Sequence, residues 1–215
     1  MRIVIAGGHG QIALLAARLL ADAGHRPVGL IRDTAQAGDL TAAGAEPAVV
    51  DLEHSDVEAV AAVLAGADAV VFAAGAGPGS GAARKLTVDR DGAVLLADAA
   101  ERAGVRRYVM VSSMGADSFD AASEDVFQVY QRAKSEADAD LRRRDLDWTV
   151  VRPGALTDEP PSGRVRLAPE TGRGSVPRAD VAALLVALLT TGAGVRAQFE
   201  LVSGETPVAE AVAGL

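Results

Sequence analysis

The chain has 215 residues, of which 49% are hydrophobic and only 3% aromatic, so its length suits one domain with a core built from Ala, Val and Leu. The net charge of −8 argues against a nucleic-acid partner, which would require a basic face to meet the phosphates. The absence of Cys excludes disulfides, thiolate metal sites and Cys nucleophiles.

Metal sites and membrane segments are also not expected. The three histidines are scattered and form no helical pair with metal-ligand spacing, so we predict no metal site. The first apolar run is too short for a signal peptide, and no run reaches the roughly 18 residues of a membrane span. We therefore expect a soluble, cytoplasmic protein that binds a small molecule and no membrane.

Short apolar strands alternate with Ala- and Leu-rich helices along the whole chain. Several of the strands are apolar on both faces, which is typical of a doubly wound parallel α/β sheet covered by helices on both sides. We expect one domain over residues 1–215. In chain order the sequence predicts a strand at 2–7, a helix at 11–24, a strand at 26–33, a helix near 35–43, a strand at 45–51, a helix at 56–66, a strand at 67–75, a helix at 92–104, a strand at 106–113, a helix at 126–144, a strand at 147–154, a helix at 180–190 and a strand at 198–204.

Two segments, 75–91 and 154–179, are expected to be irregular. Both follow the carboxyl end of a strand, where open α/β sheets bind ligands. We expect 154–179 to be a small substrate-side loop that covers the site. Its arginines, which include Arg164, Arg166 and Arg173, are interpreted as solvated charges, with the binding of an anionic substrate as the alternative.

The stretch "GGHGQIA", Gly7 to Ala13, lies between the first strand and the first helix. Glycines at this place permit a tight turn and let backbone amides approach a pyrophosphate, whose charge then faces the helix N-terminus. The alternative is an ordinary strand-to-helix turn. The place within a βαβ unit favours dinucleotide binding, with contacts expected from Gly7, Gly8, His9, Gly10, Gln11 and Ile12.

The end of the second strand, "LIRD", bears on the choice of dinucleotide. A carboxylate there accepts the ribose hydroxyls of NAD, whereas an Arg suits the 2′-phosphate of NADP. Arg32 stands at this place and can clamp a phosphate with its planar guanidinium, although Asp33 follows directly. We therefore favour NADP(H) over NAD(H).

Tyr130 and Lys134 stand four residues apart on a predicted helix, so they project from one face. A tyrosine hydroxyl with its ordinary pKa of about 10 is a poor base, and an adjacent ammonium lowers that pKa. Ser112 and Ser113 end the fifth strand, where a hydroxyl can donate to a carbonyl or a developing alkoxide. Ser113 is the preferred candidate of the two. The alternative is that Tyr130 belongs to the core and Lys134 to the solvated surface.

These motifs, together with "LDWTVVRPGALTDEP" (residues 146–160), resemble the short-chain dehydrogenase/reductase superfamily in its atypical branch of small NAD(P)-binding proteins, which includes NmrA-like and epimerase-like members. The resemblance implies a Rossmann-type fold. It implies that Tyr130 is the general acid or base, and that Lys134 binds ribose and lowers the tyrosine pKa. It also implies cofactor contacts from Asp51 and Leu52 near the adenine, from Ala73, Ala74 and Gly75 below the ribose, and from Pro153 and Gly154, which with Arg152 would line the nicotinamide.

The sequence thus predicts an NADP-dependent oxidoreductase that passes hydride between nicotinamide and a small carbonyl, quinone or flavin-like compound. The short segment after the sixth strand leaves little material for a second lobe, which favours a small substrate. Two alternatives remain: an NAD(P)-binding redox sensor without turnover, and an epimerase or dehydratase acting on a small sugar. A monomer and a homodimer are both compatible with the sequence.

Overall fold

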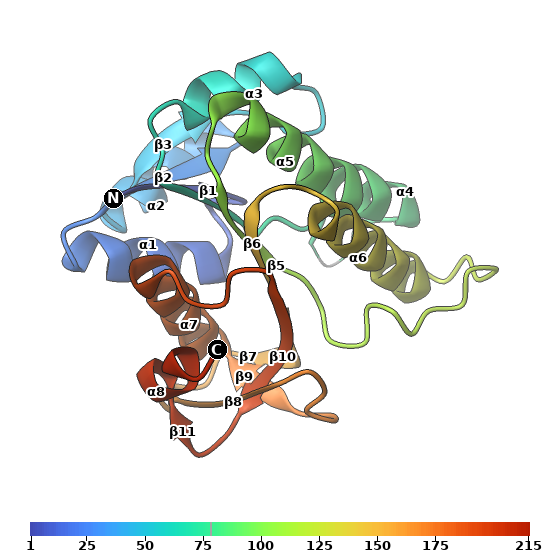
Figure 1. The fold of residues 1–215 in the computed structure, drawn as a ribbon. Helices are drawn as coiled ribbons and strands as arrows, with labels where there is room; N and C mark the ends of the chain where they lie inside the picture. The colour runs from blue at the N-terminus through green and yellow to red at the C-terminus, as the bar shows by residue number, and fades with distance from the viewer. Residues whose placement is uncertain (78) are drawn as a thin grey trace.

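A central parallel sheet organises the molecule (Figure 1). The computed structural model describes residues 1–77 and 79–215, and residue 78, in the segment expected to be irregular, lies outside them. Within the described residues, nine strands form one sheet in the order β11-β8-β10-β6-β5-β4-β1-β2-β3. The seven parallel strands are β1 (Arg2–Ala6), β2 (Arg26–Ile31), β3 (Glu46–Val49), β4 (Ala69–Phe72), β5 (Arg107–Val111), β6 (Asp147–Pro153) and β10 (Ala197–Ser203).

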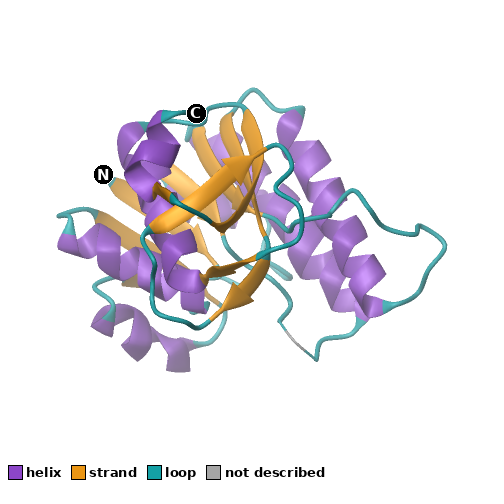
Figure 2. Cartoon of the chain, turned by 90° about the horizontal axis from the view of Figure 1, so that it is seen from below, coloured by secondary structure: helices purple, strands orange, loops and turns teal. Residues whose placement is uncertain are grey.

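Helices cover both faces of this sheet (Figure 2). Successive strand residues point to opposite faces, so Ile3 and Ile5 of β1 enter one apolar cluster while Val4 and Ala6 enter the other. The first cluster is covered by α1 (Gln11–Asp22), α2 (Ala37–Ala42), α7 (Arg178–Thr191) and α8 (Val208–Ala213). The second is covered by α3 (Val57–Leu64), α5 (Gly92–Ala103) and α6 (Val126–Arg142).

The expected Rossmann-type sheet is confirmed, and each predicted strand and helix is present with shifts of a few residues at its ends. A short 3-10 helix, η1 (Thr34–Gln36), precedes α2. In the part of the chain that the structure describes, no helix is long and apolar enough to span a bilayer.

The first departure lies in residues 75–91, which are only partly irregular. Residues Ala82–Arg84 form α4, and Lys85–Asp91 continue as a π-helix, η2, that runs directly into α5. Sequence reasoning missed these turns because the π-helix is wider than the 3.6-residue repeat, and because it buries a charged residue, Asp89, where an apolar one was sought.

The second departure lies in residues 154–179, which are not a simple loop. The segment contains β7 (Ala155–Thr157), β8 (Arg164–Ala168) and β9 (Ser175–Pro177). Strand β8 runs antiparallel to β10 and to the short β11 (Thr206–Pro207), and β7 pairs with β9 in a sheet of two strands. Gly and Pro between these strands concealed them, since each strand is too short to show a clear alternation.

Candidate functional site

The glycine loop after β1 packs directly onto neighbouring backbone. Gly7 has a φ of 76°, and a Cβ there would lie 2.6 Å from the Cα of Ala74. A Cβ on Gly8 would lie 2.6 Å from the Cα of Gly29 in β2. Helix α1 then begins after Gly10, which offers no side-chain cap, so the first amides of the helix are not taken by a capping side chain. These amides are available to an anion.

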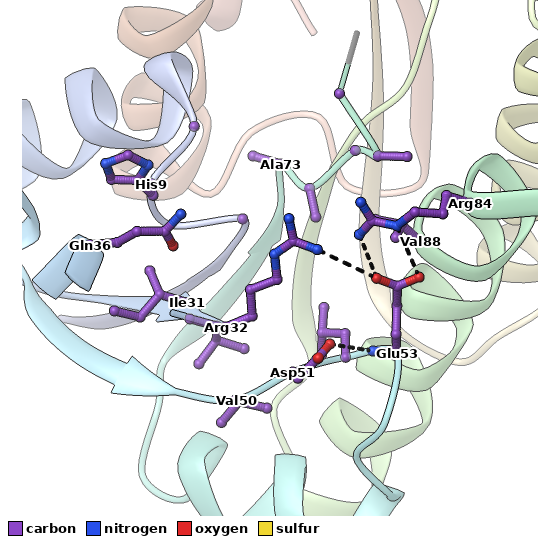
Figure 3. Close-up of a pocket in the computed structure, with 18 of the residues that line it drawn as sticks. His9, Ile31, Arg32, Gln36, Val50, Asp51, Glu53, Ala73, Arg84 and Val88 are labelled. Carbon is purple, nitrogen blue, oxygen red and sulfur yellow. Dashed lines mark hydrogen bonds and ion pairs between the residues drawn. The ribbon is translucent and has the colours of Figure 1, made fainter. Parts of the chain in front are cut away.

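A pocket of about 520 Å³ opens beside this loop (Figure 3). It lies where the chain order of the sheet reverses, between β1 and β4, which is the place where doubly wound sheets bind their ligands. Its walls come from the glycine loop, from the ends of β2, β3 and β4, and from the start of the helix at 82–91. The lining residues are Gly7, His9, Gly10, Gln11, Leu30, Ile31, Arg32, Gln36, Val50, Asp51, Leu52, Glu53, Ala73, Ala74, Gly75, Ala76, Gly77, Arg84 and Val88.

Two guanidinium groups and one carboxylate form the polar wall of the pocket. Figure 3 shows Arg32 and Arg84 both directed at Glu53, with nitrogen–oxygen distances of 3.7 and 2.5 Å. The hydrogen bond from Arg84 holds the pKa of Glu53 below its ordinary value. Arg32 is 55% exposed and makes the longer contact, so its guanidinium remains accessible to a ligand. The two guanidinium groups share the Glu53 carboxylate, and Asp51 adds a second carboxylate to the pocket lining.

Asp51 lies below this cluster, at the end of the segment after β3. Its carboxylate accepts the N–H of Glu53 at 3.0 Å and contacts the His54 ring nitrogen at 2.9 Å. The hydrogen bond with His54 lowers the pKa of Asp51. The contact with Glu53 fixes the turn that aims Glu53 at the two arginines.

Tyr130 and Lys134 stand on α6, and the Nζ of Lys134 donates to the carbonyl of Val111 at the end of β5 at 3.4 Å. Lys134 is 3% exposed, and its Nζ lies 3.3 Å from Asp89 Oδ1 and 5.9 Å from the centre of the Tyr130 ring. Burial lowers the pKa of Lys134, but the charges of Asp89, Tyr130 and Asp138 together with the Asp89 hydrogen bond outweigh it, so the pKa lies above its ordinary value and Lys134 is an ammonium. The Nζ also donates to the carbonyl of Ala74, which lines the pocket. Lys134 therefore joins Tyr130 to the pocket.

The two serines after β5 differ in what they contact. Ser112 is buried, and its hydroxyl donates to Asp138 at 2.7 Å. Ser113 is half-buried, and its Oγ makes only a 3.4 Å contact with the Met114 carbonyl. A hydroxyl has a single proton to donate, so Ser113 is the serine whose proton is available.

The segments that build this site also match a known protein family. The NAD(P)H-binding family matches residues 7–192, which include the glycine loop, the pocket and the Tyr130–Lys134 pair. The chain is a member of the NAD(P)H-binding family.

Relatives of this family member cover its whole length. The protein YhfK of Bacillus subtilis, described as an uncharacterized sugar epimerase, is 37% identical over 213 residues, which span 99% of each chain. A solved Bacillus halodurans protein, a candidate NAD-dependent epimerase/dehydratase, is 35% identical with a TM-score of 0.91 over 100% of both chains. The oxidoreductase ylbE of Lactococcus lactis is 27% identical with a TM-score of 0.86, covering 100% of this chain and 96% of its own. The NAD(P)H-binding fold thus occurs among both epimerase-like and oxidoreductase relatives.

Most of the predicted cofactor residues of this NAD(P)H-binding protein come together. Gly8 and Ile12 belong to the glycine loop without lining the pocket, and Lys134 reaches it only through Ala74. The predicted residues that line the pocket are Gly7, His9, Gly10, Gln11, Arg32, Asp51, Leu52, Ala73, Ala74 and Gly75. Sequence reasoning missed Gln36, Glu53 and Arg84. A signal existed for Glu53, which follows Asp51 by two residues, but none for Arg84, which stood in a segment expected to be irregular.

Pro153 and Gly154 lie farther along the sheet, at the end of β6. The Pro153 carbonyl accepts the N–H of Met114, and the Gly154 N–H donates to Leu201, so both positions are fixed next to the serine segment. Arg152 departs from expectation. Its side chain is buried in ion pairs with Asp138 and Asp117 instead of lining a nicotinamide site, because a buried carboxylate requires a cationic partner.

Proposed function

We propose that this NAD(P)H-binding protein is an NADP-dependent oxidoreductase that transfers hydride between nicotinamide and a small carbonyl, quinone or flavin-like substrate. One observation carries the proposal: the buried ammonium of Lys134 lies between the ring of Tyr130 and the pocket, with Ala74 as the shared contact. An ordinary surface lysine would not be 3% exposed, and a core tyrosine would not be half-buried.

The residues present fit a dinucleotide. A Cβ on Gly7 or Gly8 would meet backbone, so only glycine allows this loop its position, and the α1 amides beside it suit a pyrophosphate. Arg32 and Arg84 provide guanidinium groups that can bind a 2′-phosphate, and Asp51 would meet the adenine. When bound, the cofactor would supply the hydride chemistry.

The chain's own groups would manage the proton. Tyr130 would donate a proton to the substrate oxygen, or accept one in the reverse direction. Lys134 would hold the ribose hydroxyls and stabilise the phenolate through its charge. Ser113, whose proton is available, would orient the substrate oxygen by donating a hydrogen bond to it.

Calorimetric titration with NADPH and NADH tests the cofactor assignment. We expect NADPH to bind more tightly, and Arg32→Ala to weaken NADPH by about tenfold or more because a charge-assisted contact is lost. NADH affinity should change little. Arg102→Ala, which removes an equal charge from the surface pair with Glu58, is the control. Equal loss of both dinucleotides in Arg32→Ala would contradict the assignment.

Tyr130→Phe tests the proton-transfer role. The variant should keep NADPH affinity and lose turnover of carbonyl substrates by about 100-fold or more, as general acid–base groups contribute. A variant with the wild-type rate on carbonyls would show that Tyr130 moves no proton. Retained activity on quinones or flavins alone would assign the protein to those substrates, whose reduction need not use a protein acid.

An epimerase or dehydratase of small sugars is the second candidate, favoured by the descriptions of the Bacillus relatives. Such an enzyme regenerates its cofactor, so the sugar would change without net change in nicotinamide absorbance. Chromatography of sugar products with catalytic amounts of NADP⁺ separates the two candidates. Conversion that consumes cofactor in equal amount supports the oxidoreductase.

A further inference from the structure

Both lysines of the chain face one tyrosine. The 21 Lys and Arg residues include only two lysines, Lys85 and Lys134. Their ammonium groups lie 5.4 and 5.9 Å from the centre of the Tyr130 ring. Every other basic residue is an arginine, so the only two compact ammonium groups among its side chains are gathered at the proposed site.

The two ammonium groups differ in charge balance. Lys134 is paired with Asp89, which is 1% exposed, so the Asp89 carboxylate offsets part of the charge that Lys134 presents to Tyr130. Lys85 is half-buried, and among the residues that the structure describes it forms no ion pair. Its basic neighbours in residues 82–91 behave differently, since Arg84 pairs with Glu53 and Arg90 pairs with Asp91 and Glu136. Lys85 is therefore the uncompensated positive charge beside Tyr130.

Residues that are adjacent in the sequence of α4 and η2 point to two different parts of the proposed site. Arg84 and Val88 line the cofactor pocket (Figure 3). Lys85 and Asp89 instead turn to α6, where they meet Tyr130 and Lys134. Lys85 does not line the pocket, but its Nζ donates to the carbonyl of Gly77 at 2.9 Å, which holds the ammonium in place. An ammonium has three donors, so two remain for a ligand.

An exposed aromatic side chain also lies beside Tyr130. Phe127 is 59% exposed although aromatic residues are rare in this chain, and its ring centre lies 6.1 Å from that of Tyr130. An exposed aromatic side chain beside the proposed acid offers a surface for the body of a substrate. A fixed ammonium and an exposed ring thus flank the same hydroxyl-bearing side chain.

We propose that Lys85 binds an anionic group of the substrate, so that the natural substrate is a carbonyl compound with a carboxylate and an apolar body. This inference rests on the proposed function. With a net charge of −8, the molecule repels anions in general. An anionic substrate would therefore need a local unpaired cation, such as Lys85, in order to bind. The carbonyl end would meet Tyr130, the carboxylate would meet Lys85, and the apolar body would lie against Phe127.

The kinetic test uses two aldehydes that differ in one charge, 4-carboxybenzaldehyde and its methyl ester, at saturating NADPH. Lys85→Met should lower kcat/KM for the carboxylate by about tenfold or more, as expected for a lost charge-assisted contact, and for the ester by less than about twofold. Lys85→Arg should restore much of the loss. Arg102→Met is the matched control, because Arg102 precedes β5 and so lies at the opposite edge of the sheet.

A second readout needs no turnover. Labelling with 13C-lysine gives only two side-chain resonances, one from each lysine. In the presence of NADP⁺, a panel of carboxylates from pyruvate to 4-carboxybenzaldehyde should shift the Lys85 resonance, and the methyl ester should not. If turnover is absent while this shift occurs, the proposed reaction fails and the anion site stands.

Three results would overturn the anion site. The first is a Lys85 resonance that no carboxylate moves. The second is an equal loss of kcat/KM for acid and ester in Lys85→Met. The third is a loss of NADPH affinity in Lys85→Met that matches its loss of activity, because Lys85 would then belong to the cofactor.

Discussion

At the scale of single residues, Gly8 shows that close backbone approach, rather than an unusual φ, can demand glycine. The Cβ of any other residue there would lie 2.6 Å from the Cα of Gly29, and backbone cannot give way as a side chain can. Gly38 in α2 offers the contrast, because a Cβ built there meets nothing within 4 Å. The glycine pattern of the sequence therefore mixes required and replaceable positions.

This contrast predicts opposite outcomes for two equal substitutions. Gly8→Ala should destabilise the protein by about 1–3 kcal/mol, the range for overpacking, and should weaken NADPH binding. Gly38→Ala should be neutral or stabilise by up to about 1 kcal/mol, since it adds helix propensity without a clash. Urea denaturation of both variants measures the difference. Similar losses in both would mean that the loop does not pack on β2 as described.

Asp89 is a second residue whose role could not be predicted from the sequence. Its carboxylate accepts the N–H of Ala76 at 3.0 Å and faces Lys134, so it joins the loop after β4 to the proposed catalytic lysine. Burial alone lowers the pKa of Lys134, and Asp89 is the largest of the neighbouring groups that raise it.

Asp89→Asn should therefore lower the pKa of Lys134, because the amide keeps an acceptor for Ala76 but carries no charge. The pH titration of the two 13C-lysine resonances measures this shift. The Lys85 resonance, from a side chain that forms no ion pair with Asp89, identifies by contrast the resonance of Lys134. An unchanged titration of Lys134 would rule out Asp89 as the source of its raised pKa.

At the scale of elements, a buried polar network fastens α6 to β6. Asp138 of α6 is fully buried and receives hydrogen bonds from Ser112 and from Arg152 of β6. Arg152 also meets Asp117 in the turn after β5, at 2.7 Å. Since α6 carries Tyr130 and Lys134, this network sets the distance between the helix and the carboxyl end of the sheet.

Replacing Arg152 should show how much the protein is destabilised when the buried Asp138 carboxylate loses its cationic partner. Arg152→Met leaves the Asp138 carboxylate without its cation, and we expect a loss of about 3–5 kcal/mol in the free energy of unfolding. Arg106→Met, which removes an exposed partner of Asp147, should cost no more than about 1 kcal/mol. Equal losses in urea denaturation would argue that Arg152 contributes no more than a surface pair. Adding Asp138→Asn to Arg152→Met should recover part of the loss.

Helices and strands were predicted correctly where the residue pattern reflected packing alone. The parallel strands and the covering helices followed from apolar runs and alternation, and the glycine loop followed from its place after β1. The π-helix escaped prediction because Asp89 is buried for its charge rather than for packing. The Glu53–Arg84 pair beside Arg32 escaped because its two residues are 31 positions apart, and sequence spacing does not reveal a contact that the fold creates.

At the scale of the whole molecule, carboxylates tied to arginines link stability to pH. The hydrogen bond from Arg84 lowers the pKa of Glu53, and that from Arg152 lowers the pKa of Asp117. A lowered folded-state pKa stabilises the protein above the unfolded value of about 4, and this contribution is lost as pH falls toward the folded value. Asp138 acts in the opposite sense, because burial raises its pKa.

We therefore expect the urea midpoint to fall as the pH is lowered from about 5 to about 3, the range below the ordinary carboxyl pKa values. Glu53→Gln should flatten part of this decline, because the glutamine has no charge to lose. Glu58→Gln, at the exposed pair with Arg102, should leave the profile as in the wild type. A decline that is as steep in Glu53→Gln as in the wild type would show that Glu53 does not contribute.

The scarcity of lysine and the absence of cysteine have a practical consequence for probing this molecule. Lys134 is 3% exposed whereas Lys85 is half-buried, so Lys85 is the accessible lysine side chain of the two. Acylating reagents will thus place their lysine tag beside Tyr130, without any engineered attachment point. Because this tag would occupy the proposed anion site, ligands that protect Lys85 from acylation can be found by mass spectrometry of the unaltered chain.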